Sequence, residues 1–313
     1  MICLKPIRSG FHNSSNNMTP NPYLKKLGYS ENDRLVIIHT DDIGMCHASV
    51  QAFKDLWAFG TITSGATMVP CSWFPAVAQM CRENPAIDMG VHATLNAEWA
   101  AYRWVPISGG EAGSGLRDDA GYFHQWHQAV YDNARPEEVD VEVNLQIEKA
   151  LKAGIDVTHV DSHMGTIMSP LYIQSYVQAA AKRLLPNMLP RLTAQGIEMM
   201  GIGEQELAAY APIVGMLENL GVPMIDGILS MPLEHGEDHI SVAKKLLDEV
   251  PVGITHFILH PSIDTPELRA IAPDWQARVA NYKAFMSAEL KQFIESTEIK
   301  LIGYRQIRNA MRS

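Results

Sequence analysis

Short apolar runs alternate with segments of helical periodicity along most of this chain. Residues 35–40 are apolar and rich in β-branched side chains, a pattern typical of a buried parallel strand. Residues 48–59 follow with apolar side chains at helical spacing, and Gly60 stands where helices usually end. The regular part of the chain therefore opens with a strand that is followed by a helix.

The same pattern continues to the end of the chain. Further strands are expected at residues 61–69, 88–95, 156–161, 223–229, 253–260 and 300–303, with a short apolar piece at 197–202. Helices are expected at residues 73–81, 137–153, 170–185, 204–220, 241–249 and 274–295, with a helical turn at 22–27 and a break at Pro212. Strand and helix alternate about seven times, which predicts a parallel α/β fold.

The number of strand–helix units and the absence of one glycine-rich motif distinguish between the possible parallel α/β folds. No Gly-x-Gly-x-x-Gly sequence follows the first strand, which disfavours a dinucleotide-binding doubly wound sheet. About seven strand–helix units in one domain of ~290 residues favour a barrel, which need not be complete.

Two segments depart from this alternation. Residues 96–132 are rich in glycine, tryptophan and tyrosine and lack periodicity, and such long loops usually serve as lids or binding loops. Residues 1–22 are polar, rich in asparagine and serine, and without the apolar segment of a signal peptide. We expect a flexible arm at 1–22, in which Met18 could be the true start, and one domain at 23–313.

Composition and charge exclude several classes of function. The chain has 313 residues, 47% of them hydrophobic, and a formal net charge of −10 without a basic run, so nucleic acid is an unfavourable partner. No apolar run reaches the ~18 residues that a membrane span requires. The four cysteines, Cys3, Cys46, Cys71 and Cys81, show no metal-ligand spacing, which predicts reduced thiols and a cytoplasmic protein. Cys46 is expected to be a small buried thiol.

Carboxylates and imidazoles fall at the carboxyl ends of several predicted strands. They are Asp41, Asp42, His92, His159, Asp161, His163 and His260. The carboxyl ends of barrel strands meet at one mouth, and these groups together match the ligand set of a divalent metal site. A lone aspartate at such a place could cap the next helix, and a lone histidine could pack in the core, but convergence from separate strands favours a functional cluster.

Spacing within the cluster restricts the roles of its members. Asp41 and Asp42 are adjacent and cannot share one direction in a strand, so one should ligate the metal and the other should take a proton from the attacking water. His163 lies beyond the turn that follows its strand and can reach the centre, whereas His159 lies deeper and could orient or pack instead. His260, from a remote strand, could donate a proton to a leaving group.

Six short motifs carry a family resemblance. They are TDDIG at 40–44, GTITS at 60–64, GVHATL at 90–95, HVDSH at 159–163, HP at 260–261 and WQAR at 275–278. In order and spacing, from about residue 34 to 307, the chain resembles the YdjC/ChbG-like carbohydrate deacetylases, distant relatives of the NodB-type polysaccharide deacetylases.

The resemblance implies a fold, a reaction and roles for individual residues. The fold would be a distorted (β/α) barrel of about seven parallel strands, and the reaction the metal-dependent removal of an acetyl group from an N-acetylated sugar. Asp41 would be the general base, His260 the acid, and His159 no ligand. The metal ligands carried over by position are Asp42, His92 and His163. Two histidines and one carboxylate suit one zinc ion, with magnesium, manganese or cobalt as alternatives.

Substrate contacts are expected from the long loop and from the last long helix. Trp99 and Tyr122 could stack on a sugar face or merely pack within the loop. Arg278 could contact substrate and pair with Asp41 to tune its pKa, or form a surface salt bridge.

Two other functions compete with sugar deacetylation. One is a barrel hydrolase of a non-sugar amide or ester, although such enzymes usually carry an HxH pair on the first strand, where this chain has Asp41 and Asp42. The other is a non-catalytic sugar-binding barrel without a metal. For the deacetylase and for the sugar-binding barrel, the expected partner is a small carbohydrate. A homodimer is also possible.

Overall fold

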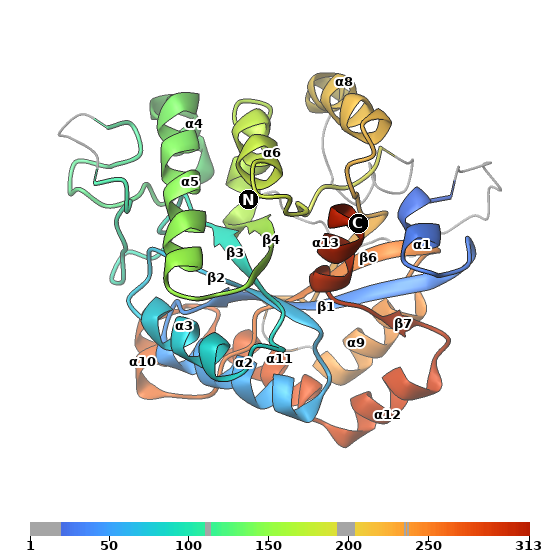
Figure 1. Ribbon diagram of the computed structural model, residues 1–313. Helices are drawn as coiled ribbons and strands as arrows, with labels where there is room; N and C mark the ends of the chain where they lie inside the picture. Colours follow the sequence, from blue (N-terminus) through green and yellow to red (C-terminus); the bar gives the residue numbers. More distant parts are fainter. Residues whose placement is uncertain (1–19, 110–113, 193–203, 235, 237) are drawn as a thin grey trace.

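The apolar runs form parallel strands of one sheet, which crosses the middle of the molecule in Figure 1. The computed structural model describes residues 20–109, 114–192, 204–234, 236 and 238–313, and the apolar piece expected at 197–202 lies outside them, as do residues 1–19 of the expected arm. Within the described residues the sheet has seven strands in the order β4-β3-β2-β1-β6-β5, with β7 also paired to β1. The strands are β1 (Arg34–Ile43), β2 (Ser64–Thr67), β3 (Met89–Ala93), β4 (Val157–Ser162), β5 (Gly227–Ser230), β6 (Gly253–Leu259) and β7 (Lys300–Leu301).

Helices cover both sides of this sheet. In the view of Figure 1, α4, α5, α6 and α8 lie above the sheet and α2, α3, α9, α11 and α12 lie below it. Among the described residues, no helix combines the length and the apolar character needed to cross a bilayer. The helices are α1 (Pro22–Lys26), α2 (His47–Phe59), α3 (Phe74–Glu83), α4 (His127–Asn133), α5 (Pro136–Lys152), η1 (His163–Met168, a 3-10 helix), α6 (Ile173–Ala181), α8 (Glu204–Asn219), α9 (His239–Asp248), α10 (Pro266–Ile271), α11 (Trp275–Phe285), α12 (Ala288–Ser296) and α13 (Tyr304–Arg312).

The predicted α/β fold with parallel strands is confirmed, and the differences lie in element boundaries. The helix expected at 274–295 is two helices, because the side chain of Ser287 accepts a hydrogen bond from Leu290 N and so caps a new helix. Pro212 lies inside α8 without ending it. The long loop contains a short helix, α4. Cys46 is a buried free thiol, as predicted.

An extended segment, residues 186–191, joins the two edge strands of the sheet. Its backbone hydrogen bonds to Val160 of β4 measure 3.0 and 3.1 Å, and those to Ile225, just before β5, measure 2.8 and 3.0 Å. The sheet is therefore not closed by a ladder of strands, yet main-chain bonds bridge its open side. This arrangement matches a distorted (β/α) barrel and keeps the carboxyl ends of β1, β3, β4 and β6 around one mouth.

Gly90 of β3 makes room inside the barrel for a histidine of β4. A Cβ atom at position 90 would lie 2.4–2.7 Å from three atoms of the His159 ring. That ring is fully buried and stacks on Tyr304 with centroids 3.9 Å apart. Glycine at position 90 thus permits an imidazole to lie flat against the backbone of the neighbouring strand.

We expect Gly90→Ala to lower the free energy of unfolding by about 1–3 kcal/mol, because the added methyl group overpacks a rigid interior. Gly215→Ala, in the interior of α8, is the matched control. An added Cβ there meets no atom within 4 Å, so that variant should gain about 0.5–1 kcal/mol from better helix propensity. Urea titration followed by circular dichroism measures both, and an unchanged midpoint for Gly90→Ala would show that the histidine can move aside.

Candidate active site

The end of β1 bulges and brings two adjacent carboxylates to one place. The pairing register of β1 with β2 shifts between Thr40 and Ile43, and Asp42 adopts a left-handed φ of 59°. Such a conformation costs a non-glycine residue about 1–3 kcal/mol and is frequent at functional sites. Asp41 Oδ2 and Asp42 Oδ1 lie 3.9 and 3.3 Å from the same atom, Nε2 of His92. The expectation that adjacent carboxylates must point apart is wrong here, because the chain is not extended at Asp42.

The three residues expected to bind metal lie together at the centre of the mouth. Asp42, His92 and His163 are buried, and each offers a ligand atom within 4.8 Å of the others. Asp42 Oδ1 lies 3.3 Å from His92 Nε2 and 3.1 Å from His163 Nδ1. They come from β1, β3 and the start of η1, so three separate elements place them.

The donor set and its spacing fit a divalent metal ion. Ligand atoms bound tetrahedrally to zinc at about 2.0–2.2 Å stand about 3.3–3.5 Å apart, close to the separations within this group. His92 Nδ1 donates to Asp161 Oδ1 at 2.8 Å, which leaves Nε2 as the nitrogen available to a metal. A carboxylate on the far nitrogen of a ligating imidazole is a common arrangement in metal proteins.

Carboxylates raise the pKa values of both imidazoles. Burial would lower the pKa of His163, but Glu98 and Asp42 outweigh it and raise that pKa to about 9. Burial also opposes protonation of His92, yet Asp161 and Asp41 raise its pKa well above the ordinary value. In the metal-free protein each imidazole therefore holds a proton that a metal ion would displace.

Glu98 is a site residue that sequence reasoning missed. Its Oε2 lies 3.0 Å from His163 Nε2, on the side of the ring opposite Asp42. Glu98 sits in the irregular loop before Trp99, outside every strand end, so no periodicity or motif marks it. The loop at 96–132 thus contributes a partner to a metal-ligand candidate, His163.

Arg278 of α11 holds the metal-ligand candidate of β1. Its Nη1 donates to Asp42 Oδ2 at 2.7 Å and its Nε donates to Asp274 Oδ1 at 2.8 Å. Burial would raise the pKa of Asp42, but the Arg278 guanidinium together with His163 and His92 outweighs it and keeps that pKa well below its ordinary value. The expected pairing of Arg278 with Asp41 is wrong, and so is the surface alternative, because the guanidinium is buried against Asp42.

Asp41 and His260 face each other where the site opens. His260 Nε2 lies 3.8 Å from Asp41 Oδ2, and their side chains are 16% and 9% exposed, against 1% for His92. Burial would raise the pKa of Asp41, but His92, His39 and His260 outweigh it and keep that pKa below its ordinary value. Burial lowers the pKa of His260, and the neighbouring Asp42 and Asp41 oppose that effect. Asp41 is consequently ionised at neutral pH and able to accept a proton.

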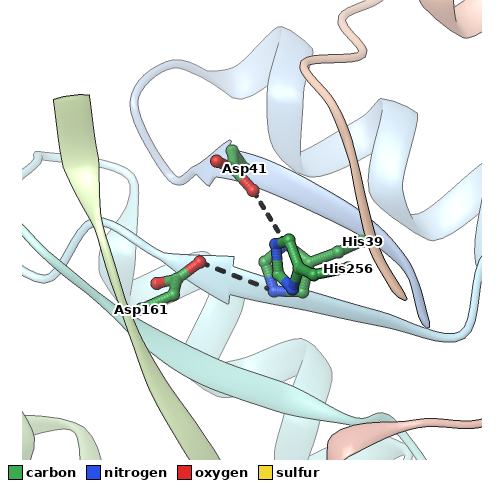
Figure 2. A group of neighbouring side chains, drawn as sticks. All are labelled: His39, Asp41, Asp161 and His256. Carbon is green, nitrogen blue, oxygen red and sulfur yellow. Dashed lines mark hydrogen bonds and ion pairs between the residues drawn. The ribbon is translucent and has the colours of Figure 1, made fainter. Parts of the chain in front are cut away.

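A second group of buried polar side chains lies behind Asp41, and Figure 2 shows it. His39 Nδ1 lies 2.7 Å from Asp41 Oδ1, and His39 Nε2 lies 3.6 Å from Asp161 Oδ2. His159 lies deeper, with its Nε2 2.9 Å from His39 Nε2. Sequence reasoning missed His39 because it stands inside the apolar run of β1, although its spacing of two residues from Asp41 was a usable signal.

The aromatic residues expected to contact substrate occupy different surroundings. Trp99 is 7% exposed, lies under the guanidinium of Arg278 at 5.3 Å, and meets Trp104 edge-on. Tyr122 is 37% exposed, and the Arg103 guanidinium lies 5.3 Å from the centre of its ring. Trp99 therefore packs beside the metal-ligand candidates, whereas Tyr122 presents part of its ring to solvent.

Comparisons with known proteins identify the family of this chain. The chain is 32% identical over 292 residues to a carbohydrate deacetylase of Thermus thermophilus, covering 92% of this chain and 98% of that protein. It is 24% identical over 271 residues to a carbohydrate deacetylase of Thermoanaerobacter pseudethanolicus, covering 87% and 98%. A crystal structure from Enterococcus faecalis V583, described as a cellobiose-phosphate cleavage protein, has the same fold, with a TM-score of 0.70 at 24% identity over 88% of this chain and 99% of that one. The model of the family described as YdjC-like protein matches residues 35–296, and the chain belongs to that family.

Proposed function

We propose that this protein is a metal-dependent hydrolase that removes the acetyl group from an N-acetylated sugar. The observation that carries the proposal is the meeting of Asp42, His92 and His163 beside an ionised Asp41, with His260 across the opening. Hydrolysis of an amide needs a base for water, an acid for the departing amine and stabilisation of negative charge on oxygen. The relatives named carbohydrate deacetylase support a carbohydrate as the substrate and deacetylation as the reaction.

A divalent ion on Asp42, His92 and His163 would polarise the acetyl carbonyl and make a bound water more acidic. Zinc suits this donor set best, with magnesium, manganese and cobalt as alternatives. Each ligand is held from behind by a partner. Arg278 fixes Asp42, and Asp161 and Glu98 fix the two imidazoles, which limits the rotamers that the ligands can adopt.

Asp41 is the proposed base and His260 the proposed acid. Asp41 Oδ2 takes a proton from the water whose oxygen bonds to the acetyl carbon. The proton then passes from Asp41 to His260, whose atoms are 3.8 Å apart. His260 gives it to the amine nitrogen as the carbon–nitrogen bond breaks, so acetate and a free amino sugar leave and both groups return to their starting state.

Substrate contacts are proposed for Trp99, Arg278 and Tyr122. Trp99 and Arg278 form a stacked pair beside Asp42 and would contact the sugar on that side of the site. Tyr122 offers the exposed aromatic face that sugar C–H groups favour.

The test of the proposal is acetate release from N-acetylated mono- and disaccharides, with and without added zinc or magnesium. N-acetylated amines without a sugar and simple acetate esters form the second arm. Release from sugars alone supports the proposal, and release from the second arm alone would point to another amide or ester hydrolase. Sugar binding without any release would indicate a non-catalytic barrel.

Replacing the base should abolish turnover while the metal still binds. We expect Asp41→Asn to lower kcat by about 10²–10⁴-fold, because the amide cannot take the water's proton. Asp156→Asn is the control, since that carboxylate precedes β4 at the opposite end of the barrel and pairs with Arg308. Acetate release gives kcat and calorimetry gives the metal affinity. Near-normal turnover by Asp41→Asn would contradict the role of Asp41.

Metal binding should tighten as the pH rises. Below about pH 9 the raised pKa of His163 means that the metal-free site holds a proton there, and His92 holds another. Each ion should then release about one to two protons, and affinity should increase up to that pH. Calorimetry in two buffers of different ionisation enthalpy counts the protons.

Glu98→Gln provides the matched variant for this measurement. It removes the charge that contributes most to the raised pKa of His163, so fewer protons should be released and the rise in affinity should occur at lower pH. Metal affinity that is independent of pH in both proteins would argue against these ligands.

Loss of the exposed ring should weaken substrate binding without slowing the chemistry. We expect Tyr122→Ala to raise KM about three- to tenfold at unchanged kcat, since stacking contributes about 0.5–1.5 kcal/mol. Tyr122→Phe keeps the ring and should retain the normal KM. Equal KM values for Tyr122→Ala and the wild type would show that the Tyr122 ring does not bind substrate and only packs within the loop.

A further inference from the structure

We propose that His39 is a positioning residue, which fixes the Asp41 carboxylate through Nδ1 and is itself fixed by a line of buried hydrogen bonds that ends at Asp88. The proposal rests on the proposed function, because it takes Asp41 as the base. His39 is not among the metal ligands or the proton-transfer pair, and it does not reach the opening, since it is 0% exposed.

The first link joins two side chains on the same face of β1. His39 and Asp41 are two residues apart in an extended strand, so both point into the barrel. Nδ1 of His39 lies 2.7 Å from Oδ1 of Asp41. The other oxygen of that carboxylate, Oδ2, faces His260 and His92 at 3.8 and 3.9 Å. A bond to Oδ1 thus stops rotation of the carboxylate and leaves Oδ2 toward the place where water must be deprotonated.

The second part of the line holds the His39 ring in turn. His39 Nε2 lies 2.9 Å from His159 Nε2, and His159 Nδ1 lies 3.0 Å from Thr158 Oγ1. Thr158 donates to Asp88 Oδ1 at 2.5 Å. Asp88 is anchored at the far end of the barrel by the backbone N–H of Arg305 at 2.7 Å. Every member of the line is at most 7% exposed, so water does not compete for these bonds.

The same surroundings could be taken for a second metal site, since His39, Asp41, Asp161 and His256 each offer an atom within 4.8 Å of the others. Nε2 of His256 and Oδ2 of Asp161 also lack a hydrogen-bond partner among the described residues. Figure 2 shows, however, that the His39 ring lies between its neighbours with one nitrogen directed at Asp41. Its other nitrogen is 2.9 Å from His159, so a metal could bind His39 only by breaking one of these two bonds.

The test compares two substitutions at position 39. In His39→Leu the hydrogen bond to Asp41 is lost, and we expect kcat to fall about 10²-fold, the loss typical of a misplaced catalytic group. KM and metal affinity should stay within about twofold, because neither substrate nor ligands are touched. In His39→Asn the amide nitrogen can stand where Nδ1 stands and donate to Oδ1, so most of kcat should return.

The matched control is His256→Leu. His256 is fully buried and its ring lies 4.5 Å from that of His39, but its hydrogen bond runs from Nδ1 to Tyr304 Oη. The His256→Leu variant should be less stable than the wild type, without a comparable loss of kcat. Circular dichroism verifies folding of each variant, and metal analysis of His39→Leu and His256→Leu tests the second metal site. Loss of one bound ion in both would overturn the positioning role.

Other outcomes also separate the two proposals. Normal kcat in His39→Leu, or an His39→Asn variant as slow as His39→Leu, would overturn the positioning role while leaving the deacetylase intact. A wild type that releases no acetate would refute the proposed function instead. In that case, nuclear magnetic resonance of histidine-labelled protein still decides the inference. The His39 Nδ1–H signal should shift in Asp41→Asn and not in Asp156→Asn, and an unshifted signal would overturn it.

Discussion

The structure depends on one local constraint, the burial of two adjacent carboxylates at a bulge in β1. Asp42 adopts a left-handed backbone conformation, which places both carboxylates beside the same imidazole. Burial of two negative charges is costly unless each is paired and hydrogen-bonded. A guanidinium from α11 and imidazoles from β3, η1 and the position just after β6 provide those partners. The helix and the strand ends must therefore be in place before the bulge is stable.

Much of this arrangement could be predicted from the sequence, because apolar runs mark the strands and polar residues mark their ends. The positions of Asp41, His92 and His260 followed from that rule and from the family resemblance. Three features could not be predicted in this way. The φ of Asp42 depends on tertiary partners, Glu98 lies in a loop without periodicity, and His39 is hidden among apolar neighbours.

Closure of the barrel links distant parts of the chain to the same site. The extended segment at 186–191 carries no apolar period that would mark it as a strand, yet it bonds to β4 on one side and to Ile225, just before β5, on the other. It thereby connects β4, which carries Asp161, to the other side of the barrel. On that side β5 pairs with β6, and His260 follows β6. Main-chain bonds next to Asp161 thus connect β4 to the part of the sheet that carries His260.

The partners of the two aspartates, and not their directions, distinguish their roles. Arg278 is permanently charged and donates to Asp42 Oδ2, while two imidazoles surround Oδ1, so both oxygens are occupied by groups that favour a fixed ligand. Among the described residues Asp41 has a hydrogen-bond partner on Oδ1 alone, and Oδ2 faces the opening with only longer contacts. An ionised carboxylate with one oxygen held and one free is suited to accept a proton. The elements packed around two identical neighbours in the sequence therefore support the proposed division into a ligand and a base.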